Sequence, residues 1–412
     1  MTSIIQEYKN YFLNNYNHFF AVSIFCFYPI TFFLGTGVVN FFVLCIDIIL
    51  IIEIIRKKKF NFFHNITFYS LLLLWVMLLI NIFFSIDPLN SLGRSVGFIR
   101  FIFFVMAIIY YFNINNQKYQ KIILGSWLLI FSITIFDLIF EIIMGHNILG
   151  FKSYMYGRLS GFFNDELIAG HYFYAFILII LSFIYKILNN LNLHYKNIHI
   201  VNLFYPIIFL FFSVSFLIGE RSNFIKISAM IFLFIFLFDK KFFVKKIILL
   251  FSMMIIFLSV INFHPDYKDR FITQFKDPIK YIAGSGYKDH FESGLKIFLE
   301  NKITGVGLKN YRVEVKNNKY TNPSIHPHHI HVEFLSELGL IGYISFIIFF
   351  ILNFINYYKS PCQNNKHYKL AGLLFIITTF IPFLPSGSFF TSHAATLFWM
   401  NFGFMSFREK IN

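Results

Sequence analysis

Charged residues are scarce in this sequence. Asp, Glu, Lys and Arg make up only 13% of the 412 residues, whereas 57% are hydrophobic and 22% are aromatic. Soluble domains are nearer half apolar and a quarter charged, so this composition excludes an ordinary soluble protein. A membrane-spanning helix needs about 20 mostly apolar residues. Runs such as "ITFYSLLLLWVMLLINIFF" therefore predict transmembrane segments.

Cysteine is also rare, and the chain lacks the marks of a cleaved leader. Cys26 and Cys45 fall in apolar runs and Cys362 in a polar loop, so no disulfide framework is implied. The first 20 residues contain no basic region followed by a small-residue cleavage site, so we expect the first apolar run to remain as an anchor. No internal repeat or linker is visible, and we expect one membrane domain over residues 1–412.

The apolar runs predict an all-α polytopic membrane protein with about twelve transmembrane helices. Backbone groups in lipid must pair internally, which favours helices over open strands. The expected segments are 18–37, 38–55, 66–84, 97–112, 121–143, 167–188, 198–217, 223–238, 247–263, 331–355, 369–385 and 393–407. Pro382 and Pro385 are read as ordinary kinks within one of these helices.

The basic residues of the short loops indicate the topology. Most of them fall in one alternating set of loops, which the positive-inside rule places in the cytoplasm together with both termini. The long segment 264–330, between the ninth and tenth spans, then lies outside, and its "YKDHFESGLKIFLENK" predicts a short helix. The net charge of +15 is thereby explained by topology and anionic lipid rather than by nucleic acid.

Two polar stretches on the predicted outer side carry arginines. Arg158 precedes the sixth span, and Arg221 follows Glu220 in a very short turn between the seventh and eighth. A guanidinium matches phosphate oxygens in a bidentate way, so both are candidate phosphate ligands. The alternatives are that Arg221 snorkels to the interface or pairs with Glu220, and that Asp165 merely caps the sixth span.

Four histidines stand just before the tenth span, at positions 326, 328, 329 and 331. A metal site is disfavoured because HExxH spacing and accompanying Cys or Asp ligands are missing. A structural cap and a general base remain open, since imidazole can take a proton from an acceptor hydroxyl. Within the spans, Asp47, Asp137 and Glu141 have either structural roles or a role in a proton relay.

Two stretches, "GVGLKNYR" and "HPHHIHVEFLSELGLIG", resemble the C-terminal signature of the O-antigen ligase and O-antigen polymerase superfamily. His328 matches the family's histidine, and Glu337, Gly339 and Gly342 match its E-x-G-x-x-G pattern. His329 departs from the pattern because it stands where Asn is usual. "GRLSGFFNDELIAGHYF" and "GERSN" also resemble the family's R-x-x-G-x-F segment and its R-[ST] turn.

The resemblance implies a glycosyltransferase of the bacterial inner membrane, with its active site facing the periplasm. It would move a glycan from an undecaprenyl-diphosphate carrier to lipid A–core or another glycan acceptor, among membrane lipids, by an inverting, metal-independent reaction without a cofactor. The alternatives are a polysaccharide polymerase, a protein O-oligosaccharyltransferase and, in a different class, a lipid or glycan transporter. Transporters usually place their sites near the midplane in matching broken helices.

The resemblance also assigns roles to residues. His328 is the expected base, and Arg221 and Arg158 are expected to hold the diphosphate, with Lys288 or Arg270 as a third cation. The supporting residues are His326, His329, His331, Glu337, Glu220 and Asp165.

Overall fold

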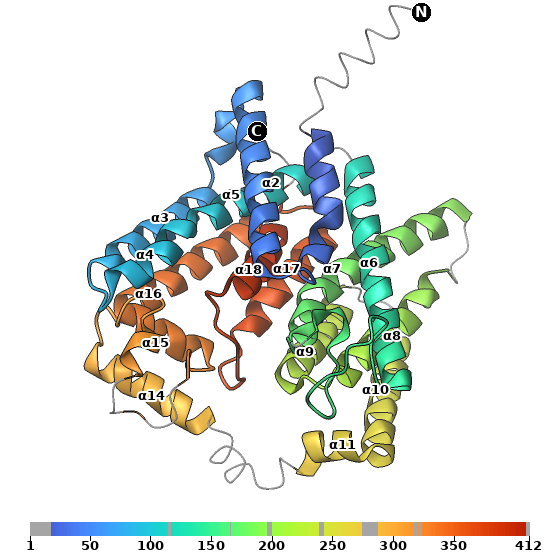
Figure 1. Ribbon diagram of the computed structural model, residues 1–412. Coiled ribbons are helices and arrows are strands. Elements are labelled where there is room, and N and C mark those ends of the chain that lie inside the picture. The colour runs from blue at the N-terminus through green and yellow to red at the C-terminus, as the bar shows by residue number, and fades with distance from the viewer. Residues whose placement is uncertain are drawn as a thin grey trace, which may run out of the picture.

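The computed structural model describes residues 18–113, 117–164, 166–195, 200–238, 243–273, 287–316, 320 and 324–408. Over these ranges every regular element is a helix, and no strand occurs among them. The all-α prediction is confirmed, and Figure 1 shows the helices gathered into one bundle with α14 and α15 at one edge.

The first half of the chain forms the following helices. An apolar helix at His18–Thr31 is followed by α2 (Thr36–Lys57), α3 (Ile66–Ile82), α4 (Pro88–Gly97), α5 (Ile99–Asn113), α6 (Gln117–Met144), α7 (Ala169–Tyr195), α8 (Phe204–Leu217), α9 (Arg221–Phe238) and α10 (Phe243–Phe263). Short 3₁₀ turns lie at Phe60–Phe63, Gly161–Phe163 and Ile200–Leu203.

The second half begins with the predicted long outer segment. It contains α11 (Pro265–Lys268), a π-helical turn (Asp269–Thr273), α14 (Tyr287–Glu300) and α15 (Tyr311–Glu314), and it is followed by α16 (Ile330–Lys359), α17 (Lys366–Thr379) and α18 (Ser392–Met405). The helix predicted from "YKDHFESGLKIFLENK" is confirmed as α14.

Six helices in the described part of the chain are long and apolar enough to cross a membrane. They are Thr36–Lys57, Pro88–Phe112, Tyr119–Met144, Ala169–Leu191, Phe243–Phe263 and Ile330–Lys359. Shorter apolar helices lie at His18–Thr31, Ile66–Ile82 and Phe204–Leu217. The protein is thus a helical membrane protein, while twelve crossings and the outward position of segment 264–330 remain predictions.

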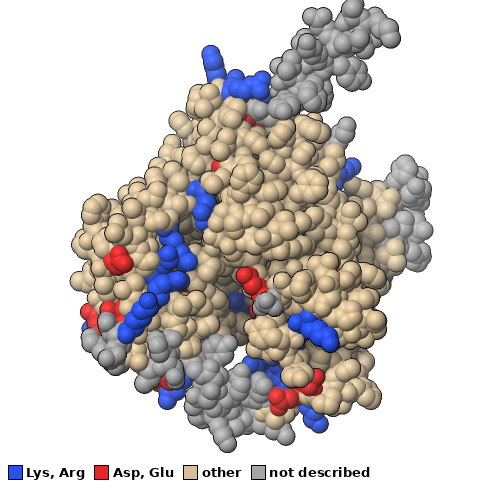
Figure 2. Space-filling model, viewed as in Figure 1, with Lys and Arg blue, Asp and Glu red and all other residues tan. Residues whose placement is uncertain are grey.

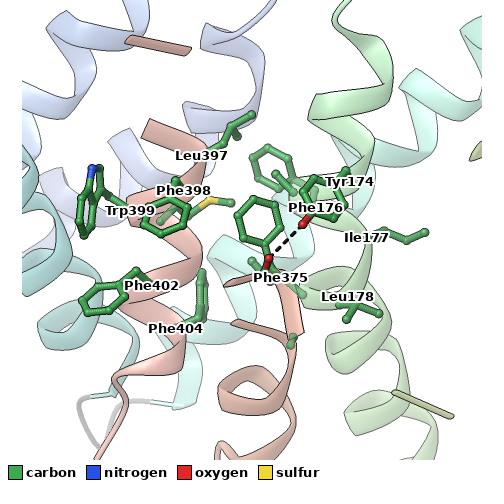
Figure 3. Packing of buried hydrophobic residues seen from close by; sticks show 14 of the residues in the cluster. Tyr174, Phe176, Ile177, Leu178, Phe375, Leu397, Phe398, Trp399, Phe402 and Phe404 are labelled. Carbon is green, nitrogen blue, oxygen red and sulfur yellow. Dashed lines mark hydrogen bonds between the residues drawn. The ribbon is translucent and has the colours of Figure 1, made fainter. Parts of the chain in front are cut away.

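Aromatic side chains fill the centre of the bundle around α18. Phe398 and Trp399 of α18 are almost fully buried and pack edge-to-face, with ring centroids 5.0 Å apart. Tyr174 of α7 donates its hydroxyl to the carbonyl of Phe375 on α17 (2.9 Å), as Figure 3 shows. This packing fixes the helices whose ends carry the polar residues.

A break at Gly339 divides α16 into two helices. Gly339 has φ 64° and ψ −166°, a conformation that side chains rarely adopt. Backbone groups freed by the break pair with the segment that contains "GVGL", which therefore lies directly against α16. The hydrogen bonds are Val306 N to Ser336 O (2.9 Å), Gly307 N to Glu337 O (2.8 Å), Leu340 N to Lys302 O (2.8 Å) and Ile341 N to Ile303 O (3.1 Å).

The prediction of one helix over 369–385 was wrong at its end. α17 stops at Thr379, and residues 380–391 form a connecting loop before α18. Pro382 and Pro385 lie in this loop and do not kink a helix. Proline lacks a backbone N–H and the residue before it avoids the helical region, which accounts for the loop.

Candidate active site

The turn between α8 and α9 touches the segment that precedes α7. Gly219 in this turn has φ 73°, and a Cβ added there would lie 1.8 Å from the carbonyl oxygen of Gly157. The N–H of Leu159 donates to the carbonyl of Ile218 (3.1 Å). This contact joins the two sequence stretches that were predicted to bind phosphate.

The contact places Arg158 beside Glu220. Their side chains form an ion pair with an N–O distance of 3.2 Å, and Arg158 also donates to the carbonyl of Leu167 (2.7 Å). Burial raises the pKa of Glu220 above its usual range, against the opposing effect of the Arg158 charge. The predicted partner of Glu220, Arg221, is engaged elsewhere.

Arg221 and Arg270 form a reciprocal contact. Arg221 donates to the backbone carbonyl of Arg270 (3.1 Å), while the Nε of Arg270 donates to the carbonyl of Gly219 (2.6 Å). The hydroxyl of Tyr267 secures the same region by donating to the carbonyl of Leu217 (2.5 Å). Arg158, Arg221 and Arg270 thus converge on one turn, and we call them the arginine cluster.

Lys288 lies apart from these contacts. It stands exposed on α14, and its Nζ is 3.7 Å from Glu292 one turn later on the same helix. Of the two candidates for a third cation, the structure brings Arg270 to the arginine cluster, and no contact that it shows connects Lys288 to it.

The histidines separate into two pairs. His329 and His331 are tied into the fold: the Nε2 atom of His329 lies 2.6 Å from the carbonyl of Pro382, and that of His331 lies 3.0 Å from the carbonyl of Phe380. Because a carbonyl only accepts, Nε2 carries the hydrogen in both rings. The Nδ1 of His329 then accepts from the N–H of Val332 (3.4 Å) and caps α16.

His326 and His328 form the second pair, together with His290 of α14. The ring centroids of His326 and His328 are 4.0 Å apart, and those of His290 and His328 are 5.2 Å apart. Burial, with a smaller effect of His290, lowers the pKa of His328 to about 4. Burial and His328 lower the pKa of His326 to about 3. Both rings are therefore neutral at neutral pH, as a proton acceptor must be.

The backbone of His328 is unusual, because its φ of 54° lies in the left-handed region. A non-glycine residue held there costs about 1–3 kcal/mol, and such residues cluster at functional sites. Pro327 restricts the preceding backbone, and the carbonyl of His328 accepts from the N–H of Ser386 (2.9 Å). The ring is consequently presented from a fixed backbone.

The loop 380–391 connects the histidines with the arginine cluster. Ser222, next to Arg221, donates its hydroxyl to the carbonyl of Pro385 (2.5 Å), and the following residue, Ser386, bonds to His328. The buried Glu333 of α16 fixes the far end of the loop by accepting from the Ser388 hydroxyl and the Phe389 N–H. Figure 2 shows that this face is hollowed between the part with α14–α16 and the part with α9 and α10.

The remaining predicted residues form structural hydrogen bonds or lie outside the residues that the structure describes. Glu337 accepts from the N–H of Lys309 (2.8 Å) and so ties "GVGLKNYR" to α16. Asp165 lies outside the described residues. Asp137 and Glu141 accept backbone N–H groups from the segment after α6, which favours their structural interpretation.

The sequence did not single out His290 or the loop 380–391. His290 is a lone histidine on a polar helix, and only the folded chain stacks it on His328. The prolines of the loop were the available signal. Within the described residues, no group of three or more His, Cys, Asp or Glu side chains is arranged to hold a metal ion.

A comparison with known families gives an independent result. Residues 206–347 match the family described as O-Antigen ligase, whereas no curated protein matches the chain. The match covers about a third of the chain and contains Arg221, Arg270, His328 and Glu337, while Arg158 precedes it. The resemblance drawn from the motifs is thereby confirmed, and residues 206–347 are similar to the O-antigen ligase family.

Proposed function

We propose that the protein is a glycosyltransferase that moves a glycan from an undecaprenyl-diphosphate carrier to a hydroxyl of lipid A–core at the periplasmic face of the inner membrane. One observation carries the proposal. Ser222, the neighbour of Arg221, and His328 are hydrogen-bonded to adjacent residues of one loop, Pro385 and Ser386, within a chain whose residues 206–347 match the O-antigen ligase family.

The arginine cluster supplies the site for the carrier diphosphate. Three guanidinium groups gather at one turn, where Arg158 pairs with Glu220 and Arg221 and Arg270 bond to backbone carbonyls. The cluster also surrounds the first residue of α9, and the N-terminus of a helix favours an anion. Exposed apolar side chains of α9 and α10, including Phe232 and Phe251, offer a surface for the polyprenyl tail.

The reaction is a displacement at the anomeric carbon of the donor sugar. The acceptor oxygen forms a bond to this carbon as the bond from the carbon to the phosphate oxygen breaks. The electron pair leaves with the carrier diphosphate, whose developing charge the arginines stabilise. The hydroxyl proton passes to the neutral ring of His328, and attack opposite the leaving group inverts the anomeric centre.

A bound diphosphate also adjusts the strength of the base. In the free protein the pKa of His328 is lowered to about 4, which makes the ring available but weakly basic. A nearby anion favours the charged form of an imidazole and raises its pKa. Donor binding would therefore bring His328 toward the pH at which a general base is most effective.

The same residues would serve a polymerase, whose acceptor is a second carrier-linked unit, or an enzyme that glycosylates protein. These activities differ from ligation in the acceptor and not in the donor chemistry. Transport is less well supported because the arginines and histidines gather at helix ends and connecting loops, whereas carriers usually bind substrate near the midplane.

A lipopolysaccharide gel on a deletion strain tests the proposal. The strain is complemented with the wild type, with His328→Ala, with Arg221→Ala and with Lys152→Ala, an exposed basic residue that serves as the matched control. We expect uncapped core and accumulated carrier-linked polymer in the deletion strain, rescue by the wild type and by Lys152→Ala, and no rescue by the other two.

Other patterns on this gel would redirect the proposal. Core capped with single repeat units would contradict ligation and indicate a polymerase. An unchanged profile in the deletion strain would contradict both activities for this glycan. Full rescue by His328→Ala would contradict the assignment of the base.

A further inference from the structure

A second group of cations lies near the histidines and consists of Arg94 of α4, Lys309 and Arg312 of α15. Hydrogen bonds fix these segments to one another although they are distant in sequence. Asn90 donates to the carbonyl of Lys309 (2.9 Å), and Ser91 donates to the carbonyl of Leu308 (2.8 Å). We call Arg94, Lys309 and Arg312 the basic stripe, and Figure 2 shows a run of Lys and Arg across this part of the face.

Within the part of the chain that the structure describes, no carboxylate forms an ion pair with the basic stripe. All three side chains are half-buried, yet among the described residues none has an Asp or Glu oxygen within 4.0 Å. The Nε of Arg312 is buried without a hydrogen-bond partner. Burial and the charges of Arg94 and Arg312 lower the pKa of Lys309, against the opposing effect of Glu337.

The acids nearest to the stripe already have partners. Glu337 accepts from the backbone of Lys309 (2.8 Å), and Glu333 accepts from Ser388 and Phe389. Lys309 itself has φ 66°, so its backbone is held in the left-handed region by the contact with Glu337. Glu337 and Glu333 act electrostatically on Arg94, and Glu337 also acts on Lys309 and Arg312, so three cations face two buried acids. A fixed group of half-buried cations that outnumbers its acids fits an anionic ligand.

The stripe adjoins the candidate base through His326 and His290. Arg312 and Arg94 both interact electrostatically with His326, whose ring is 4.0 Å from that of His328. The hydroxyl of Tyr311, beside Arg312, donates to the carbonyl of His290 (3.2 Å), which stacks on His328. The candidate base is therefore connected both to the loop that reaches Ser222, beside Arg221, and to a second cationic group. Two cationic groups suit a transfer reaction, which has two substrates.

We infer that the basic stripe binds a phosphate group of the acceptor glycolipid and so places the acceptor hydroxyl beside His328. This inference rests on the proposed function, because it assigns the second substrate of the same site. It makes the enzyme selective for phosphorylated acceptors. The basic stripe positions the acceptor in this scheme, because the arginine cluster holds the donor.

The test uses the full chain in nanodiscs of phosphatidylcholine with two acceptor probes, lipid A–core and the same glycolipid after phosphatase treatment. Arg94→Gln and Arg312→Gln remove cations from two different elements, and Lys316→Gln removes an exposed cation of the same segment as a control. Acceptor binding is measured directly, and KM for the acceptor and for the donor are measured in the transfer assay.

We expect Arg94→Gln and Arg312→Gln to weaken binding of lipid A–core about tenfold or more and to raise its KM, with the KM of the donor and the Lys316→Gln control unchanged. Removing the phosphates from the probe should weaken its binding to the wild type by the same factor. It should weaken binding to the two variants little further. Bidentate guanidinium–phosphate contacts have this strength.

Three results would overturn the inference: unchanged binding in both variants, equal weakening for both probes, or displacement of lipid A–core by phosphatidylglycerol at equal concentration. The last would identify an ordinary anionic-lipid site. Because binding is read separately from transfer, a wild type that binds lipid A–core selectively but transfers nothing would contradict the proposed function and not the phosphate site.

Discussion

The histidines before α16 show how neighbouring residues of one type acquire different roles. His329 and His331 each bond to a backbone carbonyl and hold the chain, whereas the rings of His326 and His328 lie against each other at a tilt. Sequence alone predicted the importance of His328 through the family motif, and it left the structural and catalytic readings of the others open. Only the fold distributes the roles, because the carbonyls of Phe380 and Pro382 come from another element.

His329→Asn is expected to keep the cap on α16. Asn is among the best N-cap residues, and it can accept the N–H of Val332 as the imidazole does. His329→Ala should lower the free energy of unfolding by about 1 kcal/mol. Thermal denaturation of both variants in detergent measures the difference, and a loss as large for Asn as for Ala would show that the cap is unimportant.

The lowered pKa of His328 predicts the acid limb of the pH–rate profile. A general base acts in its unprotonated form, so kcat/KM should stay level through neutral pH and fall as pH drops through about 4. His290→Gln should move this limb to higher pH, because it removes a neighbour that disfavours the charged ring. A limb near pH 6.5 in the wild type would show that burial does not perturb His328.

At the scale of elements, the E-x-G-x-x-G pattern acquires a physical explanation. Gly339 permits the break in α16, and the backbone groups freed there form hydrogen bonds with the segment that contains "GVGL". Two motifs that are separated in sequence therefore form one unit. Helix positions and the helix in the outer segment could be predicted from apolar and 3.6-residue periodicity. The end of α17 could not, because residues 380–385 are as apolar as the helix before them.

Gly339→Ala tests this unit. A Cβ there would lie 2.3 Å from the carbonyl oxygen of Ile303, and φ 64° disfavours any side chain. We expect a loss of at least about 1–3 kcal/mol in the free energy of unfolding. Gly125→Ala is the matched control, since that helical glycine has nothing within 4 Å of an added Cβ and alanine favours the helix by about 1 kcal/mol. Equal stability of the two variants in a detergent melt would contradict the role of the break.

At the scale of the whole molecule, the topology predicted from the basic loops would place both cationic groups on one side of the membrane. Charge counting gave this arrangement from the sequence, but it could not show that the segments before α7, between α8 and α9 and around α15 meet at one set of histidines. Those contacts join residues far apart in the chain, such as Ser222 with Pro385 and Asn90 with Lys309.

Cysteine labelling tests the topology directly. In a background without Cys26, Cys45 and Cys362, single cysteines replace exposed lysines on each predicted side. Lys152→Cys and Lys316→Cys should react with a membrane-impermeant maleimide in intact spheroplasts. Lys58→Cys and Lys359→Cys should react only after permeabilisation. Labelling of the two pairs in the reverse order would place the proposed site in the cytoplasm.

The most direct test of the central claim is transfer by the purified full chain in nanodiscs, with a labelled carrier-linked glycan and lipid A–core as acceptor. We predict that the wild type and Lys152→Ala release the carrier diphosphate as the labelled lipid A–core product forms. His328→Gln and Arg221→Ala should each lower kcat by about 10²–10⁴, the usual range for loss of a general base or of transition-state stabilisation. A wild type that transfers no glycan, or His328→Gln at the wild-type rate, would contradict the account.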